Sequence, residues 1–246
     1  MDGFWGDRDP SIAESDSLGP RVVRERSLRT VEQLVDAVSS EISWRRKELT
    51  DLKCLLEAAA SNRTRQSTLT RAALALLYAH WEGYVKSVAE MYLEFVCMQR
   101  CRNLELSDSL LAVTLRSMLA SSEGSHKIKS HVDIVQFFRT QMETRSRLPY
   151  KSVIRTEFNL SSTVFFEILR TLGFTASECE SKSHMLDHQL LAKRNHVAHG
   201  NNLPIDIDEY FHLHDEILAL MNLLRNYIEN AAETGAYLRA PKALRN

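Results

Sequence analysis

The chain has 246 residues, of which 44% are hydrophobic and 26% charged, and its 31 lysines and arginines nearly balance its 32 aspartates and glutamates. This composition is typical of a globular protein, and the near-zero net charge excludes a generally basic nucleic-acid coat. The four cysteines form no CxxC pair, and we find neither a leader-like N-terminus nor an apolar run of about 18 residues, so we expect a cytoplasmic protein in a reducing compartment with no membrane span.

Long helices are expected in the first part of the chain, because eight glycines and five prolines are few for this length. Residues 1–26 have no apolar periodicity and are predicted to be a mobile tail, which leaves residues 27–246 as a single helical domain. Apolar residues recur every three or four positions over 28–60, which predicts the first helix. After a polar break at 62–67, a second helix is expected over 68–102. Its first half is apolar nearly all round, so it should be central in the bundle.

Shorter helices are expected further along the chain. Ser107 is a candidate N-cap for a helix that reaches Leu119, residues 121–127 should form a loop, and another helix is expected over 132–145. Residues 146–158 have no clear pattern, and a short pair of extended segments is one interpretation.

Three helices with clear end signals are expected in the last third. They are 163–172 closed by Gly173, 180–199 closed by Gly200, and a final helix that runs from a capping box of Asp206 and Glu209 to about Ala232. The predicted fold class is therefore all-α, a helical bundle of about six or seven helices.

The densest polar signal is the segment 190–200. On an ideal helix Arg194 lies in the middle of an apolar stripe, whereas Asn195 and His199 project from a different face. The charge of a buried arginine is costly without an anionic partner. Asp187, about 20° away on an ideal helix, is one candidate partner. A phosphate held in forked geometry is the other, and an ordinary ion pair between helices fits the same pattern.

His199 is expected at the C-terminus of this helix, beside Gly200. The helix dipole favours its protonated form there, so it can exchange a proton with a hydroxyl or a leaving oxygen. A histidine that only caps free carbonyl groups is the alternative interpretation. Arg194 and His199 are about 140° apart on an ideal helix. A site shared by two chains around a two-fold axis would ease that separation.

Several segments together follow a known pattern. Arg194, Asn195 and His199 read Arg-Asn-x3-His, and residues 44–49, 78–86 and 159–162 add to the match. In these segments the chain resembles the HEPN superfamily, whose ribonucleases carry an Arg-x4-6-His signature. The resemblance is to its bacterial RiboL-PSP or MAE-type subgroup and covers residues 28–230.

The resemblance implies a metal-independent endoribonuclease without a cofactor, in which the motif helices of a homodimer face each other. His199 would act as general acid and base when the 2′-OH of RNA attacks the adjacent phosphorus, Arg194 would hold the phosphate, and Asn195 would orient the groups. The products would carry 2′,3′-cyclic phosphate and 5′-OH ends. A role as a toxin or phage-defence effector, restrained by an antitoxin or another regulatory protein, is also implied.

Four further residues are predicted to support the site: Asp187, Glu82, His188 and His196. Two of them also have a plainer interpretation. Glu82 can form a structural pair with Lys86 one turn later, and His188, with His184, can be a solvated histidine or a metal ligand. The aromatic residues beside Glu82, Trp81 and Tyr84, are expected in the core rather than in a base-stacking platform.

Basic residues gather at 44–47, 62–65 and 145–147, the last with Lys151 and Arg155 nearby. These clusters either follow an RNA backbone or form solvated faces. Two other functions therefore stay open. The chain can be a non-catalytic HEPN module that binds RNA or a protein partner, or a structural helical protein in which Arg194 forms an ordinary ion pair.

Overall fold

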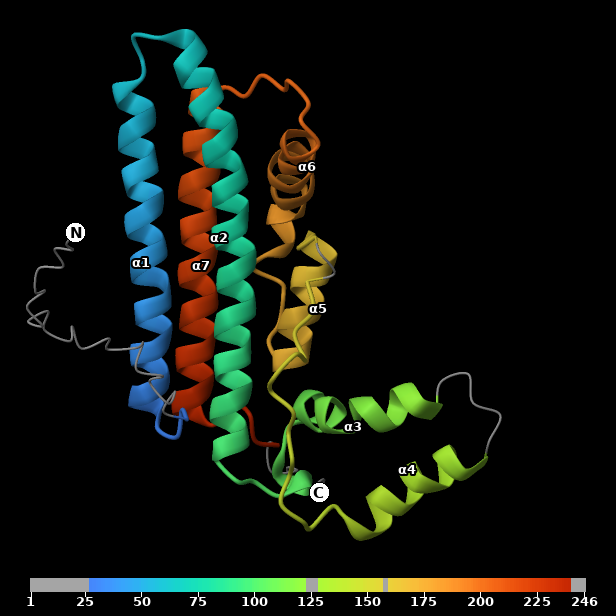
Figure 1. Ribbon diagram of the computed structural model, residues 1–246. Coiled ribbons are helices and arrows are strands. Elements are labelled where there is room, and N and C mark those ends of the chain that lie inside the picture. Colours follow the sequence, from blue (N-terminus) through green and yellow to red (C-terminus); the bar gives the residue numbers. More distant parts are fainter. Residues whose placement is uncertain (1–26, 123–127, 157–158, 240–246) are drawn as a thin grey trace, which may run out of the picture.

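The computed structural model describes residues 27–122, 128–156 and 159–239, and these ranges contain seven α-helices (Figure 1). No β-strand lies in them, apart from two isolated bridges that join Arg102 to Arg145 and Leu106 to Leu238. The all-α prediction is confirmed. The predicted N-terminal tail and most of the loop expected at 121–127 lie outside the described residues.

Three long helices, α1 (Val31–Ala58), α2 (Arg63–Met98) and α7 (Ile207–Thr234), lie side by side and form the main bundle (Figure 1). The polar break predicted between the first two helices is wrong, because the residues after Asn62 are already helical. Asn62 is the N-cap of α2, and its side chain accepts a hydrogen bond from the Arg65 amide at 3.0 Å. A strong cap thus lets a polar segment form the first turn.

The prediction that the second helix is central is confirmed, since α2 packs against α1, α7, α5 and α6. Trp81 and Tyr84, expected in the core, are fully buried. Each large apolar side chain enclosed in this way stabilises the fold by about 1.5–3 kcal/mol. Other fully buried side chains of this helix are Leu74, Leu77, Val85, Val88 and Leu93.

One arginine is enclosed within the bundle. Arg45 of α1 is 7% exposed, its guanidinium lies 4.3 Å from the centre of the Trp44 ring, and it donates to the Glu41 carboxylate at 2.9 Å. It also approaches the backbone oxygen of His80 on α2, at 3.4 Å. Gly83 makes this approach possible, because a Cβ atom there would lie 3.0 Å from Arg45 Nη1.

Beside α2 lies a second layer, formed by α5 (Ser162–Leu172) and α6 (Ala192–Ala198) (Figure 1). The α5 boundaries are confirmed: the Ser161 hydroxyl accepts from the Val164 amide at 3.3 Å, and Gly173 ends the helix at a φ of 86°. The helix expected over 180–199 is instead divided into a 3₁₀ turn, Glu180–Lys182, a π-helical segment, Met185–Leu191, and α6.

The cap of α7 is partly as predicted. Asp206 accepts hydrogen bonds from the amides of Asp208 and Glu209, at 2.8 and 3.4 Å. The Glu209 side chain does not return the bond to complete a capping box, because it pairs with Lys193 of α6. This pairing ties α6 to the start of α7.

A helical hairpin of α3 (Asp108–Ser122) and α4 (Ile128–Thr140) lies at the end of the bundle away from α6 (Figure 1). Ser107 precedes α3 as predicted, but its buried hydroxyl has no partner among the described residues, so it supplies no side-chain cap. The helix expected over 132–145 begins and ends earlier. Its predicted end is not helical because the backbone at 142–144 bonds to residues 103 and 104.

No helix in the described ranges has the length and apolar character needed to cross a membrane.

Candidate functional site

Arg194 of α6 is held against α2 and the segment before α5. Its guanidinium carbon lies 3.8 Å from the centre of the Tyr78 ring, and Nη2 donates to Asn159 Oδ1 at 3.2 Å. Tyr78 is buried, whereas Arg194 remains partly exposed. A cation over an aromatic face is attracted by the ring quadrupole. The guanidinium is therefore positioned from two sides without being fully enclosed.

Tyr78 links three parts of the chain at this point. Its hydroxyl accepts a hydrogen bond from the Leu160 amide at 2.6 Å, while its ring supports Arg194. Burial raises the pKa of Tyr78, and the Leu160 amide and the Arg194 charge act in the opposite direction. The phenol is therefore neutral at physiological pH and serves as a fixed platform.

Tyr78 and Asn159 were not among the predicted site residues. Both lie in segments that carry the resemblance, 78–86 and 159–162, so the signal that could have identified them was present. Tyr78 was hidden by its apolar surroundings on α2, where an aromatic residue is expected to pack in the core. Only the spatial proximity of α2 and α6 gives it a second role.

Asp187 has a different described partner from the one predicted. Its Oδ1 accepts from the Ser162 amide at 2.7 Å and its Oδ2 from the Ser162 hydroxyl at 2.6 Å. The described contacts of Arg194 do not include it. Asp187 therefore stabilises the N-terminus of α5, where free amides and the helix dipole favour a carboxylate.

The π-helical segment explains this difference. The Ala192 amide bonds to the Asp187 carbonyl five residues earlier, instead of four. A π-helix has more residues per turn than an α-helix, so each residue turns less about the axis. The angle of about 20° between Asp187 and Arg194 assumes an ideal α-helix. The wider turns remove that alignment and direct the two side chains to different neighbours.

Asn195 lies on α6, next to Arg194, and His199 lies at the C-terminal end of this helix. His199 is the C-cap residue and is exposed, Asn195 is partly buried, and Gly200 ends the helix at a φ of 77°. The described contacts of Arg194 do not include His199. Within one protomer the motif therefore presents a positioned guanidinium and, one turn later, an accessible imidazole.

The remaining predicted residues have separate surroundings. His196 is exposed and its Nδ1 lies 3.2 Å from Asn201 Nδ2, while His188 stacks on His184 at 4.9 Å between ring centres. In the described ranges no three His, Cys, Asp or Glu side chains are grouped as metal ligands.

Glu82 is partly buried on α2, one turn from Tyr78, and its charge contributes to the raised pKa of that phenol after the larger effect of burial. No described contact pairs Glu82 with Lys86, which is exposed. The expected structural pair is therefore absent from the described contacts. Glu82 instead lies close to the platform that supports Arg194.

Two contacts fix α6 and the loop after it. Lys193 pairs with Glu209 at the start of α7, and Arg71 of α2 donates to Asn202 Oδ1 at 2.7 Å. The motif helix is thus anchored at both ends, although it is only seven residues long. Anchoring of this kind keeps a short helix from fraying.

An all-helical bundle with Arg-Asn-x3-His at the end of a short, anchored helix defines a HEPN domain, a class in which ribonucleases and RNA-binding modules are common. Comparison with family models matches residues 40–230 to RiboL-PSP-HEPN. The chain belongs to this family, and the resemblance found in the sequence is confirmed. The match includes Tyr78, Asn159 and all three motif residues. No curated protein and no solved structure matches the chain.

Proposed function

We propose that this protein is a metal-independent endoribonuclease that acts as a homodimer. The observation that carries the proposal is Arg194, whose guanidinium rests on the buried Tyr78 ring and bonds to Asn159 while remaining partly exposed. A guanidinium fixed in this way can bind a phosphate in forked geometry without first having to be ordered.

The proposed reaction is internal transesterification of RNA. The His199 imidazole takes the proton of a ribose 2′-OH, the 2′ oxygen attacks the adjacent phosphorus, and the bond from phosphorus to the 5′ oxygen breaks. A protonated imidazole gives a proton to the leaving 5′ oxygen. Arg194 offsets the charge that develops on the phosphoryl oxygens, and Asn195 orients the phosphate. The ends formed are a 2′,3′-cyclic phosphate and a 5′-OH.

A dimer brings to one cleft catalytic groups that a single protomer does not bring together. The described contacts of Arg194 do not include His199, and an acid and a base are needed on opposite sides of the phosphorus. Two motif helices facing each other across a two-fold axis would contribute two guanidiniums and two imidazoles to one cleft. The exposure of His196, Ala198 and His199 at the C-terminal end of α6 supports this arrangement, because this end is not covered within the protomer.

We further propose that the protein is a cytoplasmic toxin or phage-defence effector restrained by an antitoxin or another regulatory protein. The near-zero net charge supports a selective nuclease, since a nuclease that coats any RNA would carry a basic surface. Expression of the wild type and of His199→Ala in two separate strains of a bacterial host tests this role. Growth arrest by the wild type alone is expected, and equal growth of both strains would contradict it.

The test of the reaction is cleavage of total RNA in excess EDTA. Wild type should cleave, and Arg194→Ala and His199→Ala should each lose about 100-fold or more of the rate, as expected for removal of a charge-stabilising or proton-transferring group. Arg170→Ala and His212→Ala remove the same residue types from exposed positions outside the site and serve as matched controls. Product ends are identified by mass spectrometry.

Three other results of this cleavage test would each contradict the proposal. RNA binding without cleavage by the wild type would replace the proposal with a non-catalytic HEPN module. Cleavage that EDTA abolishes would contradict the metal-independent mechanism. If neither binding nor cleavage occurs, the chain is a structural helical protein.

A further inference from the structure

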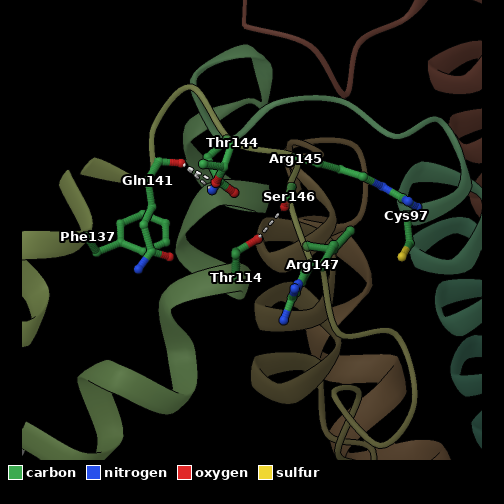
Figure 2. Close-up of a pocket in the computed structure, with 10 residues that line it drawn as sticks. Cys97, Thr114, Phe137, Gln141, Thr144, Arg145, Ser146 and Arg147 are labelled. Carbon is green, nitrogen blue, oxygen red and sulfur yellow. Dashed lines mark hydrogen bonds between the residues drawn. The ribbon is translucent and has the colours of Figure 1, made fainter. Parts of the chain in front are cut away.

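A pocket of about 830 Å³ lies where the α3–α4 hairpin joins the bundle (Figure 2). Its walls come from separate elements: Cys97 at the end of α2, Thr114 on α3, Phe137 on α4, and the segment 144–148. Figure 1 places this hairpin at the opposite end of the molecule from α6. The pocket is therefore distinct from the motif site, and an inference about it does not depend on the proposed ribonuclease activity.

The lining of the pocket is cationic. Arg145 and Arg147 line it, and none of the described lining residues is an aspartate or glutamate. Neither arginine has a side-chain hydrogen bond or an ion pair among the described residues, whereas the neighbouring Arg102 is paired with Glu105 and Glu143 at 2.7 Å each. Figure 2 shows Arg145 extending toward Cys97 and Arg147 leaving the same segment near Thr114. Both side chains are exposed, and two guanidiniums without a described carboxylate partner at one cavity favour an anionic ligand.

The remaining polar groups suit a ligand that also carries hydroxyl groups. The hydroxyls of Thr114 and Ser146 lie 3.2 Å apart, and each can make further hydrogen bonds. Asn103 is 3% exposed and donates to the Gln141 carbonyl at 2.9 Å, but its Oδ1 has no partner among the described residues. A buried acceptor without a partner is costly, so a donor on a bound molecule would stabilise it.

We propose that this pocket binds a small organic phosphate. Its volume is in the range of about 300–1,000 Å³ that is typical of small-molecule sites. Either guanidinium can take the phosphate in forked geometry, the hydroxyls and Asn103 can bond to ligand hydroxyls, and Phe137 supplies an apolar wall. A small ligand is favoured over an RNA strand because polar groups from three separate segments line one cavity, instead of following a groove.

The binding test is isothermal titration calorimetry of the full chain at low salt. The probes are ribose 5-phosphate, adenosine 5′-monophosphate and inorganic phosphate, and ribose is the phosphate-free control. At least one organic phosphate should bind, and ribose should not. The double variant Arg145→Gln/Arg147→Gln should weaken that binding at least about tenfold, which corresponds to about 1.4 kcal/mol. Arg139→Gln, an exposed arginine of the same hairpin that does not line the pocket, should bind as the wild type does.

Cys97 offers a second measurement that locates the ligand, because its partly buried thiol lines the pocket. The bound phosphate should slow alkylation of Cys97 by iodoacetamide, followed by peptide mass spectrometry, and leave alkylation of the exposed Cys54 unchanged. The proposal is overturned if no organic phosphate binds, or if the double variant binds as tightly as the wild type. It is also overturned if single-stranded RNA alone binds through these arginines, because the site would then belong to an RNA strand.

Discussion

In the described part of the chain two arginines lie on aromatic rings, one in the long-helix bundle and one on α6, and their surroundings differ. Arg45 lies 4.3 Å from the Trp44 ring centre, is 7% exposed and is paired with the Glu41 carboxylate. Arg194 lies 3.8 Å from the Tyr78 ring centre, is bonded to the Asn159 amide and is partly exposed. Accessibility, and not the aromatic contact, separates a guanidinium that holds helices together from one that a substrate can reach.

The largest expected effect is a difference in stability between the alanine variants of the two arginines. Arg45→Ala should lower the free energy of unfolding by about 3 kcal/mol, because it breaks an enclosed pair and leaves Glu41 without its partner. Arg194→Ala should cost about 1 kcal/mol, the value of a partly exposed cation–π contact and a hydrogen bond. Urea unfolding followed by circular dichroism measures both. Equal losses would make Arg194 a structural residue and remove the distinction.

The next effect tests the platform under Arg194. Tyr78→Leu removes the ring and should lower kcat/KM for RNA cleavage about 3- to 30-fold, the equivalent of a cation–π contact worth about 0.5–2 kcal/mol. Tyr78→Phe keeps the ring and removes the hydroxyl, which accepts from the Leu160 amide and also interacts with the Arg194 side chain. It should therefore lose less activity than Tyr78→Leu. If the two variants lose the same activity, the hydroxyl, and not the ring, positions the site.

A smaller effect tests how tightly Arg45 is enclosed. Gly83→Ala in the wild type should bring no gain in stability, since the new Cβ would lie 3.0 Å from Arg45 Nη1. In the Arg45→Ala background that space is open, and alanine should stabilise the interior of α2 by up to about 1 kcal/mol relative to glycine. A double-mutant cycle of unfolding free energies gives the coupling. The same effect in both backgrounds would show that the approach is not tight.

The smallest expected effect is the pH dependence of the enclosed region. Burial lowers the pKa of His80, and the nearby Glu48 carboxylate, 3.2 Å away, acts in the opposite direction to burial and to Arg45. Because the unfolded chain then binds more protons than the folded chain, this contribution to stability is present above about pH 6.5 and is lost as the pH falls toward the lower folded value. His80→Gln should reduce the stability difference between pH 7.5 and 5.5. An unchanged difference would assign it to other groups.

The sequence predicted the parts of the fold that depend on local patterns. Apolar periodicity located the long helices, Gly173 defined the end of α5, and the apolar character of α2 predicted its central position. Asn62 caps α2, but its polar neighbours are equally typical of a break between helices, because a cap and a loop have similar composition. Local signals therefore predicted the helices better than their first turns.

The candidate site was predictable in part. Arg194, Asn195 and His199 follow from the motif, but the partners of Arg194 depend on contacts between distant segments. Tyr78 is 116 positions before Arg194 in the chain, and no local rule connects them. The π-helical segment also has no recognised sequence signal, so a wheel based on α-helical geometry could not predict that Asp187 bonds to Ser162.

The most direct test of the two-chain site mixes two inactive proteins. Arg194→Ala and His199→Ala are unfolded together, refolded, and shown by native mass spectrometry to contain mixed dimers. Each mixed dimer combines an intact Arg194 from one chain with an intact His199 from the other. We predict that cleavage of RNA in EDTA returns in the mixture and is absent from either variant alone. Mixed dimers that form but remain inactive would contradict the shared site.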